Sequence, residues 1–255
     1  MSAVAISAVA FASIFGAMLL GMLLRSILPD RYLSAGSKEV VTLGTSVIAT
    51  MSAVLLGLLI SSTRTAYEEK RNQVIRMTAD VIELDLILKD YGPEARSARQ
   101  VMRDAVPSMI DSIWRENASQ FRPDANAVPD AGAEAVLYQL VQLSPHDDDH
   151  RARRERALQV GLNLAQIQLL LFSQPVNAIS TPFITVLVLW LTFIFGTFSI
   201  YTRANLLIVV VLLVCALAAA SAIFLILDLD SPFAGLLQIP SAPLRNAVPP
   251  LAAAA

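Results

Sequence analysis

The sequence predicts an all-α integral membrane protein, with four transmembrane helices and a helical soluble domain inserted between the second and third. Three observations lead to this fold class. Hydrophobic residues make up 55% of the 255 residues and charged residues only 16%, whereas soluble proteins carry roughly 25% charged residues. The apolar residues form four long uncharged runs, each close to the ~20 residues that a helix needs to cross a bilayer. The charges gather between the second and third runs, where residues 63–181 hold 14 of the 19 Lys and Arg and 17 of the 21 Asp and Glu.

The first uncharged run covers residues 3–24 and ends at Arg25. A secretory signal peptide is the competing interpretation, but no basic residue precedes the run, and it exceeds the usual 7–15 apolar residues of a signal. We therefore expect a first transmembrane helix. Ser13, Ala17 and Gly21 recur every four residues, a spacing that lets membrane helices approach closely.

The second run, residues 40–62, continues into a polar stretch that contains no glycine and no proline before Gly92. This continuity predicts one helix from Val40 to Tyr91, which crosses the membrane and runs on into water. At ~1.5 Å per residue such a helix is roughly 75 Å long, of which only ~30 Å lies in hydrocarbon.

The membrane part of this helix has one face of small and hydroxylated residues. At 100° per residue, a narrow strip holds Thr42, Ser46, Ala49, Thr50, Ala53 and Gly57. Two interpretations remain open: a close contact with another helix, or the lining of a water-filled pore.

Beyond the membrane, the same helix shows apolar residues at heptad positions a and d, typical of helices that pack along their length. The positions are Tyr67, Val74, Met77, Val81, Leu84 and Leu88. The partner is either a later helix of the same chain or a neighbouring subunit, and the pattern does not distinguish them.

The rest of the soluble domain also has helical patterns. Residues 94–117 form a helix with a kink or break expected at Pro107. A short helix follows at 134–143, and a longer one runs to Phe172, with Ser144 as N-cap and Pro145 in its first turn. We expect Asp147 and Asp149 of this helix to pair with the arginines four residues on.

Two further runs, residues 183–201 and 206–227, predict the third and fourth transmembrane helices. The predicted domains are therefore 1–62 (spans of about 3–24 and 40–62), 63–181 (helical, cytoplasmic), 182–228 (the last two spans) and 229–255 (a Pro-rich tail). Four spans place both termini and the helical domain on one side of the cell membrane. We expect this side to be cytoplasmic, since the N-terminus carries no signal and the domain no cysteine.

Few residues indicate chemistry. His146 and His150 have metal-ligand spacing, but the acids between them also suit a helix N-terminus. Asp228 and Asp230 form either an acidic ring or calcium site, or an ordinary turn at the membrane boundary. The sequence has no nucleophile elbow, P-loop, dinucleotide fingerprint or CxxC pair, so we expect neither an enzyme nor a cofactor. The net charge of −2 gives no indication of nucleic-acid binding.

Two stretches resemble the bestrophin-like family of uncharacterised bacterial membrane proteins: residues 56–74 (LGLLISSTRTAYEEKRNQV) and 226–237 (ILDLDSPFAGLL). The resemblance implies a relation to bestrophins, which are pentameric anion channels whose second span lines the pore. It implies the same position for the helix from Val40. The acidic run that binds calcium in animal bestrophins is reduced here to Asp228 and Asp230.

The expected function is a passive ion channel, anion-selective by resemblance, formed by self-association of the chain in the lipid bilayer, with inorganic anions as its permeant partners. The alternative is a non-conducting membrane scaffold or sensor whose heptad helix contacts a partner. An uncharged lining of Thr, Ser and Ala is compatible with anion passage, because weak binding sites let ions leave as well as enter.

Overall fold

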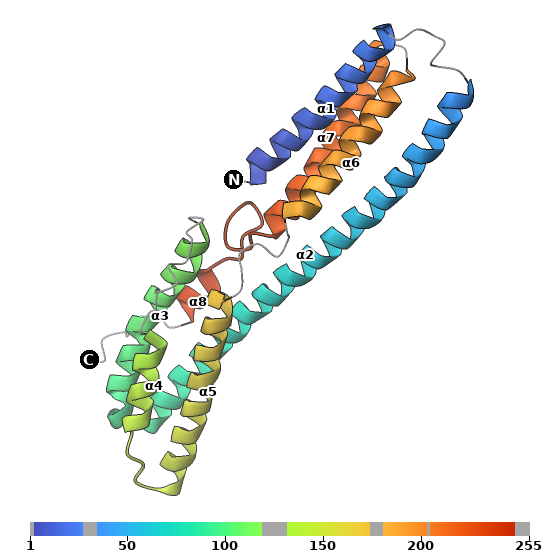
Figure 1. The fold of residues 1–255 in the computed structure, drawn as a ribbon. Coiled ribbons are helices and arrows are strands. Elements are labelled where there is room, and N and C mark those ends of the chain that lie inside the picture. The colour runs from blue at the N-terminus through green and yellow to red at the C-terminus, as the bar shows by residue number, and fades with distance from the viewer. Residues whose placement is uncertain (1–2, 28–34, 119–131, 174–180, 203–204, 248–255) are drawn as a thin grey trace. The chain divides into compact units, whose positions relative to one another are not determined.

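The computed structural model describes residues 3–27, 35–118, 132–173, 181–202 and 205–247 (Figure 1). Within these ranges every regular element is helical and no strand occurs, which confirms the predicted all-α class. The elements are α1 (Ala3–Ile27), α2 (Ala35–Tyr91), η2 (Pro93–Ala95, a 3-10 helix), α3 (Arg96–Ala118), α4 (Gly132–Gln142), α5 (Asp148–Ser173), α6 (Thr181–Ile200), α7 (Leu206–Leu229) and α8 (Ala242–Asn246).

Four helices, α1, α2, α6 and α7, are long and apolar enough to cross a membrane, as the sequence predicts. Helix α2 is the longest, with 57 residues. It is unbroken, in keeping with the absence of any proline that would interrupt its hydrogen-bond ladder. It ends at Tyr91, and the next residue, Gly92, has a φ of 104°, in the region that favours glycine.

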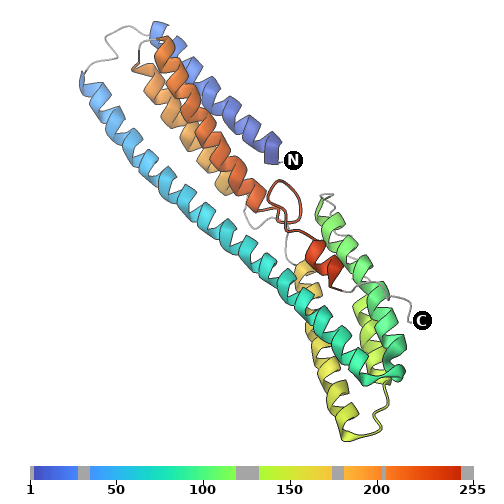
Figure 2. The same ribbon diagram turned by 180° about the vertical axis from the view of Figure 1, so that it is seen from behind.

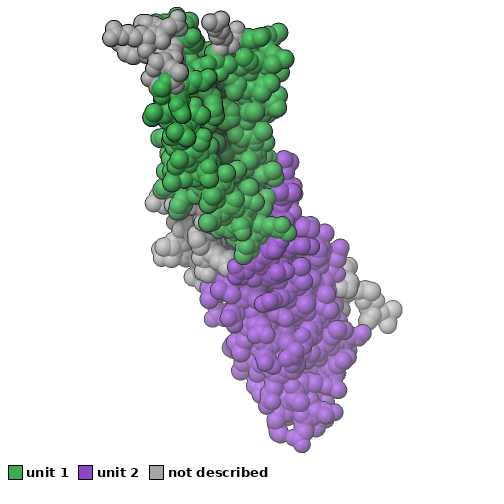
Figure 3. All heavy atoms as spheres, turned by 90° about the vertical axis from the view of Figure 1, so that its right-hand side faces the viewer, with its two compact units in different colours: residues 1–66, 177–230 green, residues 67–176, 231–255 purple. Residues whose placement is uncertain are grey.

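The chain divides into two compact units (Figure 3). The first unit comprises residues 1–66 and 177–230, and the second comprises residues 67–176 and 231–255. The first part of α2 therefore belongs to one unit and its last part to the other.

In the first unit, α1 lies along α6 and α7 (Figures 1 and 2). The contact with α6 is close at Gly21, where a Cβ atom would stand 2.5 Å from the carbonyl oxygen of Gly196 and 2.8 Å from Cβ of Ser199. A Cβ added to Gly196 would meet the carbonyl oxygen of Ala17 at 3.5 Å at the same crossing. The row of small residues on α1 thus forms a helix–helix contact inside the chain, in which only glycine leaves enough room for the neighbouring backbone.

The second unit has a core between the last part of α2 and helices α3, α4 and α5. This core consists of two clusters of buried apolar side chains. Helix α2 contributes Val74, Met77 and Val81 to the first cluster and Leu84, Leu88 and Tyr91 to the second. Segment 229–255, expected as a tail, contributes Phe233, Ile239 and Leu244 to the first cluster. Trp114 packs edge-on against Phe233, with ring centroids 5.3 Å apart, and donates a hydrogen bond to the carbonyl of Ile239.

Local helix signals in the second unit differ from expectation in two places. Helix α5 begins at Asp148, and Asp147 caps it by accepting a 2.7 Å hydrogen bond from the amide of His150. Ser144 is therefore not the N-cap, because Asp147, three residues later and next to the first residue of the helix, makes the capping bond. Helix α3 continues through Pro107 without a break, since its buried residues hold it against α2 on both sides of the proline.

The predicted ion pairs of α5 also differ. Arg151 pairs with Asp148 at 2.7 Å, three residues back, instead of Asp147. Arg153 donates to the backbone carbonyl of Asp90. The Oδ1 atom of Asp147 instead accepts from the backbone amide of His150 and lies 2.6 Å from Nδ1 of the same residue.

Candidate functional site

The membrane part of α2 has three faces with different surroundings. The first face packs inside the first unit: Thr45, Ser52, Leu59 and Thr63 are 1–6% exposed. Leu59 belongs to an apolar cluster with residues of α1, α6 and α7, including Ala10, Leu187 and Ile223. This is the face by which α2 contributes to the core of its own chain.

The second face is the small and hydroxylated strip predicted from the sequence. It lies beside the packed face and mostly outside any contact within the chain. Its members Thr42, Ser46, Thr50, Ala53 and Gly57 are exposed, and Ala49 is half-buried. A Cβ added to Gly57 would meet no atom within 4 Å.

The third face of α2 is apolar, with Leu43, Val47, Val54 and Leu58 each more than half exposed. At 100° per residue it lies opposite the packed face. Side chains of this kind are stable against lipid tails or against another apolar helix, and costly in water.

The hydroxyl groups of the second face are bonded to their own helix. Ser46 donates to the carbonyl of Thr42 at 2.8 Å, and Thr50 donates to the carbonyl of Ser46 at 2.9 Å. These bonds satisfy the hydroxyls without any partner helix. Because both residues are exposed, rotation about χ1 can redirect each O–H toward water or an anion.

The packed face holds hydroxyl residues that the sequence reasoning did not single out. Thr63 donates to the carbonyl of Leu59 at 2.8 Å and Ser52 to that of Ile48 at 2.8 Å. Thr45 has a buried Oγ1 without a hydrogen-bond partner among the described residues. Residues 45, 52 and 59 recur every seven residues, but so do pairs in the exposed strip (42 and 49, 46 and 53, 50 and 57), so spacing alone does not tell the packed strip from the exposed one.

The heptad residues of α2 lie in the second unit and pack against their own chain. Val74, Met77, Val81, Leu84 and Leu88 are 0–3% exposed, and Tyr67 is half-buried beside them. A second strip on the same helix remains outside this core, formed by Ile75, Ile82 and Leu86, which are 41–53% exposed.

The two histidines pair with acids separately. His146 Nε2 lies 2.8 Å from Glu94, and His150 Nδ1 lies 2.6 Å from Asp147. The hydrogen bonds from His150 lower the pKa of Asp147 below its ordinary value. Asp228 and Asp230 are both buried at the end of α7. Among the described residues, no group of three or more His, Cys, Asp and Glu side chains is placed to hold a metal ion.

An electrostatic cluster of one aspartate and two arginines joins α2 to α3 in the second unit. Asp85 accepts two 2.7 Å hydrogen bonds from Arg99 and further bonds of 3.2–3.3 Å from Arg103. Burial by itself would raise the pKa of Asp85, but the hydrogen bonds and charges of the two arginines outweigh it and lower that pKa. The pKa of Arg99 is raised, mainly by its bond to Asp85.

Comparison with known proteins identifies the family to which the chain is similar. A family model, the bestrophin-like domain, matches residues 6–244. A crystal structure of a bacterial bestrophin homolog from Klebsiella pneumoniae, bearing a tyrosine-to-alanine mutation, matches with a TM-score of 0.63 and 16% sequence identity, over 91% of this chain and 95% of that one. No curated protein matches the chain. At 16% identity the structural likeness shows a shared fold.

Proposed function

The chain belongs to the bestrophin-like family, and we propose that it forms a passive anion channel in the cell membrane. In this proposal several copies of the chain surround a pore that the second face of α2 lines. The helical domain and both termini lie in the cytoplasm. Membership of a family of ion channels supports conduction, and the surroundings of α2 support its position.

The observation that carries the proposal is the division of α2 into three faces. One face is buried in its own chain, and the opposite face is apolar and suited to lipid or a neighbouring helix. Between them, Thr42, Ser46, Thr50, Ala53 and Gly57 are exposed. A strip of small polar residues offers lipid few contacts, whereas water and hydrated ions need little side-chain volume and some hydrogen-bonding capacity.

The chemistry of the strip suits ions that pass without binding tightly. It contains no charged residue, so no fixed charge holds a permeating ion. Its hydroxyls supply O–H donors of moderate strength, and Ala53 and Gly57 form stretches without any donor. Weak sites separated by apolar segments permit entry and exit alike.

A tryptophan scan of two adjacent residues tests the pore assignment. Ala53→Trp places an indole in the proposed pore, and we expect chloride flux into proteoliposomes to fall at least about tenfold, because the ring occludes the path. Gly57→Trp should act in the same way. Val54→Trp is the matched control: Val54 is also exposed, but it lies on the apolar face, so flux should remain within about twofold of the unsubstituted protein.

Two results would contradict the channel. A purified protein that stays monomeric in detergent and in lipid cannot enclose water with one strip of one helix. An oligomer without chloride flux would favour the alternative, a membrane scaffold or sensor. Flux in Ala53→Trp equal to that in Val54→Trp and in the unsubstituted protein would show that the pore does not lie on this face, although the protein conducts.

A further inference from the structure

A short loop of the second unit, residues 233–239, presents two leucines at its surface. Leu236 is 80% exposed and Leu237 is 43% exposed. Among the described residues, six large apolar side chains are more than 65% exposed, and five of them belong to the candidate transmembrane helices α1, α2 and α7. The sixth is Leu236. Its exposure is therefore typical of the spans of this chain, although it lies outside every span.

The loop is closed at its base and turned near its tip. The amide of Ile239 donates a 2.8 Å hydrogen bond to the carbonyl of Pro232, and the amide of Ala234 donates to the carbonyl of Ser231 at 3.1 Å. Gly235 turns the chain with a φ of 106°, a conformation that a side chain would strain. The two leucines that follow are thus presented by a defined turn.

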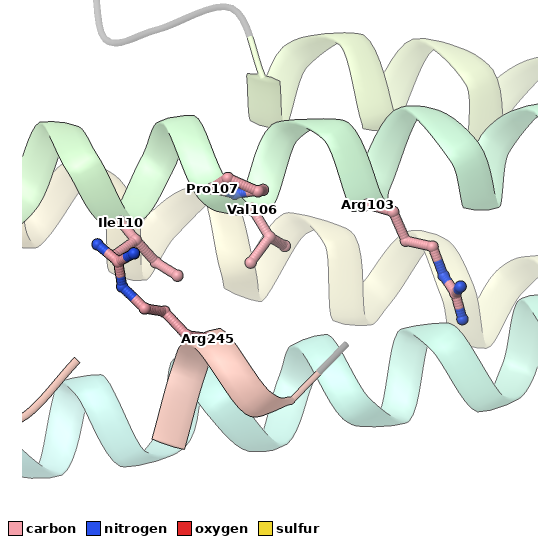
Figure 4. Close-up of a pocket in the computed structure, with 5 residues that line it drawn as sticks. All are labelled: Arg103, Val106, Pro107, Ile110 and Arg245. Carbon is pink, nitrogen blue, oxygen red and sulfur yellow. The ribbon is translucent and has the colours of Figure 1, made fainter. Parts of the chain in front are cut away.

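Both arms of the loop are anchored in the core of the second unit. Phe233 and Ile239, on either side of the leucines, are each 4% exposed, and Trp114 of α3 contacts both. Farther along, Leu244 of α8 is buried, and Arg245 extends toward α3 beside a small pocket (Figure 4). These contacts hold the loop before it meets any partner, so docking costs little ordering entropy.

The loop begins close to the end of a transmembrane helix. Helix α7 has 24 residues, and at ~1.5 Å per residue it measures about 36 Å, more than the ~30 Å of the hydrocarbon core. Its ends therefore reach the headgroup regions. Three residues lead from Leu229, the last residue of α7, to Pro232, and they span at most about 11 Å. Because Ile239 is bonded to Pro232, chain length keeps the base of the loop near the bilayer surface.

The charges around the loop are compatible with that surface. Residues 231–255 contain no aspartate and no glutamate, and their one charged residue is Arg245. Anionic headgroups attract arginine, whereas they repel carboxylates. Between its two anchors the loop has a single polar side chain, that of Gln238, which is uncharged. Insertion of the leucines therefore takes no charge out of water.

We propose that the loop 233–239 docks on the lipid bilayer, with Leu236 and Leu237 inserted among the headgroups and the upper acyl chains. The occupant of this surface is lipid, and the loop attaches the second unit to the bilayer at a point beyond α7. Docking is separate from the proposed pore and does not require that the protein conduct ions.

A nitroxide attached to Leu236→Cys tests the insertion in proteoliposomes of phosphatidylcholine and phosphatidylglycerol. Cys215 is first replaced with serine, because it is the native cysteine and is exposed on α7. Collisions of the label with oxygen, which concentrates in lipid, are compared with collisions with a water-soluble nickel chelate. Two sites of similar exposure serve as controls: Leu217→Cys within α7, and Val141→Cys on α4 of the second unit. We expect the oxygen-to-nickel ratio at 236 to be at least about fivefold that at 141 and within about threefold of that at 217.

A second pair of variants tests the leucine itself, with the nitroxide on Gln238→Cys, which is also exposed. Leu236→Ser should lower the oxygen-to-nickel ratio at 238 at least about twofold, because the loop loses apolar surface that holds it in lipid. Val141→Ser is the matched control and should leave the ratio unchanged. Equal ratios in these two variants would overturn the role of Leu236.

The same measurement distinguishes the other possible occupants. A label at 236 that meets nickel as readily as the label at 141 would place the loop in water and overturn the proposal. A label at 236 that is shielded from both reagents would show that protein, in these liposomes a second copy of the chain, covers the leucines, and this too would overturn lipid as the occupant.

Discussion

The two parts of helix α2 have equally regular residue patterns, but the predicted strip is buried in one part and exposed in the other. In the second unit, the heptad residues Val74 to Leu88 are buried by α3, α4 and α5 of the same chain. In the first unit, the strip from Thr42 to Gly57 is left exposed, and a different strip, Thr45 to Thr63, makes the contact within the chain. A regular strip in the sequence thus predicts that one face of a helix differs from the others. It does not predict whether the same chain, another subunit, lipid or water covers that face.

Chain connectivity contributes to the burial of the part of α2 that lies in the second unit. Gly92, with its positive φ, and Pro93 turn the chain sharply after α2, so the residues that follow lie against the end of the helix that has just finished. The membrane part follows α1 along the chain, but only one of its strips packs in the cluster that contains residues of α1, α6 and α7. Its remaining faces are available to lipid, water and further copies of the protein.

The largest expected effect comes from truncating the buried heptad. Leu84 is fully buried and Leu86, two residues on, is 53% exposed. Leu84→Ala should destabilise the second unit by about 2–5 kcal/mol, from lost burial and the cavity left behind, whereas Leu86→Ala should cost less than about 0.5 kcal/mol. The melting temperatures of the two purified variants measure the difference.

The Leu86 variant also tests the exposed strip that this residue shares with Ile75 and Ile82. If the oligomer dissociates in Leu86→Ala while its melting temperature is retained, that strip is a contact between subunits. If both leucine variants melt alike, the heptad is not the core of a single chain, and the comparison between the two parts of α2 fails.

A pair of glycine substitutions compares the packed and exposed membrane faces. Gly21→Ala places a Cβ 2.5 Å from the backbone oxygen of Gly196, so α1 and α6 must separate, at a cost of about 1–3 kcal/mol. Gly57→Ala meets nothing within 4 Å and should leave the melting temperature unchanged. A comparable loss in Gly57→Ala would show that another subunit packs closely on this strip, which would replace the pore lining by a helix–helix contact.

The parts of the molecule that could be predicted from sequence are those governed by periodicity and continuity. Four apolar runs gave four spans, and the absence of proline gave the unbroken α2. The start of α5 was wrong because Ser144 and Asp147 are both good caps, and only the three-dimensional path of the chain decides between them. The same limit applies to Pro107: the helix is not broken there, because buried residues on both sides of the proline hold α3 in the core.

The polar clusters of the second unit were not predictable, because their members are distant in sequence and unremarkable in type. Asp85 meets Arg99 and Arg103 across the turn at Gly92, 14 and 18 residues away, and Arg245 meets Asp111 across 134 residues. Each residue alone is an ordinary charge on a helix surface. The same holds for Phe233, Ile239 and Leu244, which join the first cluster of the core from beyond α7.

The smallest expected effect concerns two carboxylates on the second-unit part of α2, five residues apart. Burial, followed by the charge of Glu83, raises the pKa of Asp80, whereas the arginines lower that of Asp85. A lowered folded-state pKa stabilises the fold above the ordinary aspartate pKa, and this stability is lost as pH falls through the lowered value. A raised pKa has the opposite sign: ionised Asp80 opposes folding at neutral pH, and the penalty disappears as pH falls through the raised value toward the ordinary one.

Asp85→Asn should therefore lower the free energy of unfolding by about 1 kcal/mol at pH 7, since asparagine keeps one acceptor. Asp80→Asn should raise it by less than that, because solvent screens a partly exposed charge. Melting temperatures at pH 7 and at pH values near and below the ordinary aspartate pKa test both signs: both differences must shrink as the medium becomes acidic. Two losses at pH 7 would mean that Asp80, like Asp85, is held by a cation, and the contrast between the two positions would then be absent.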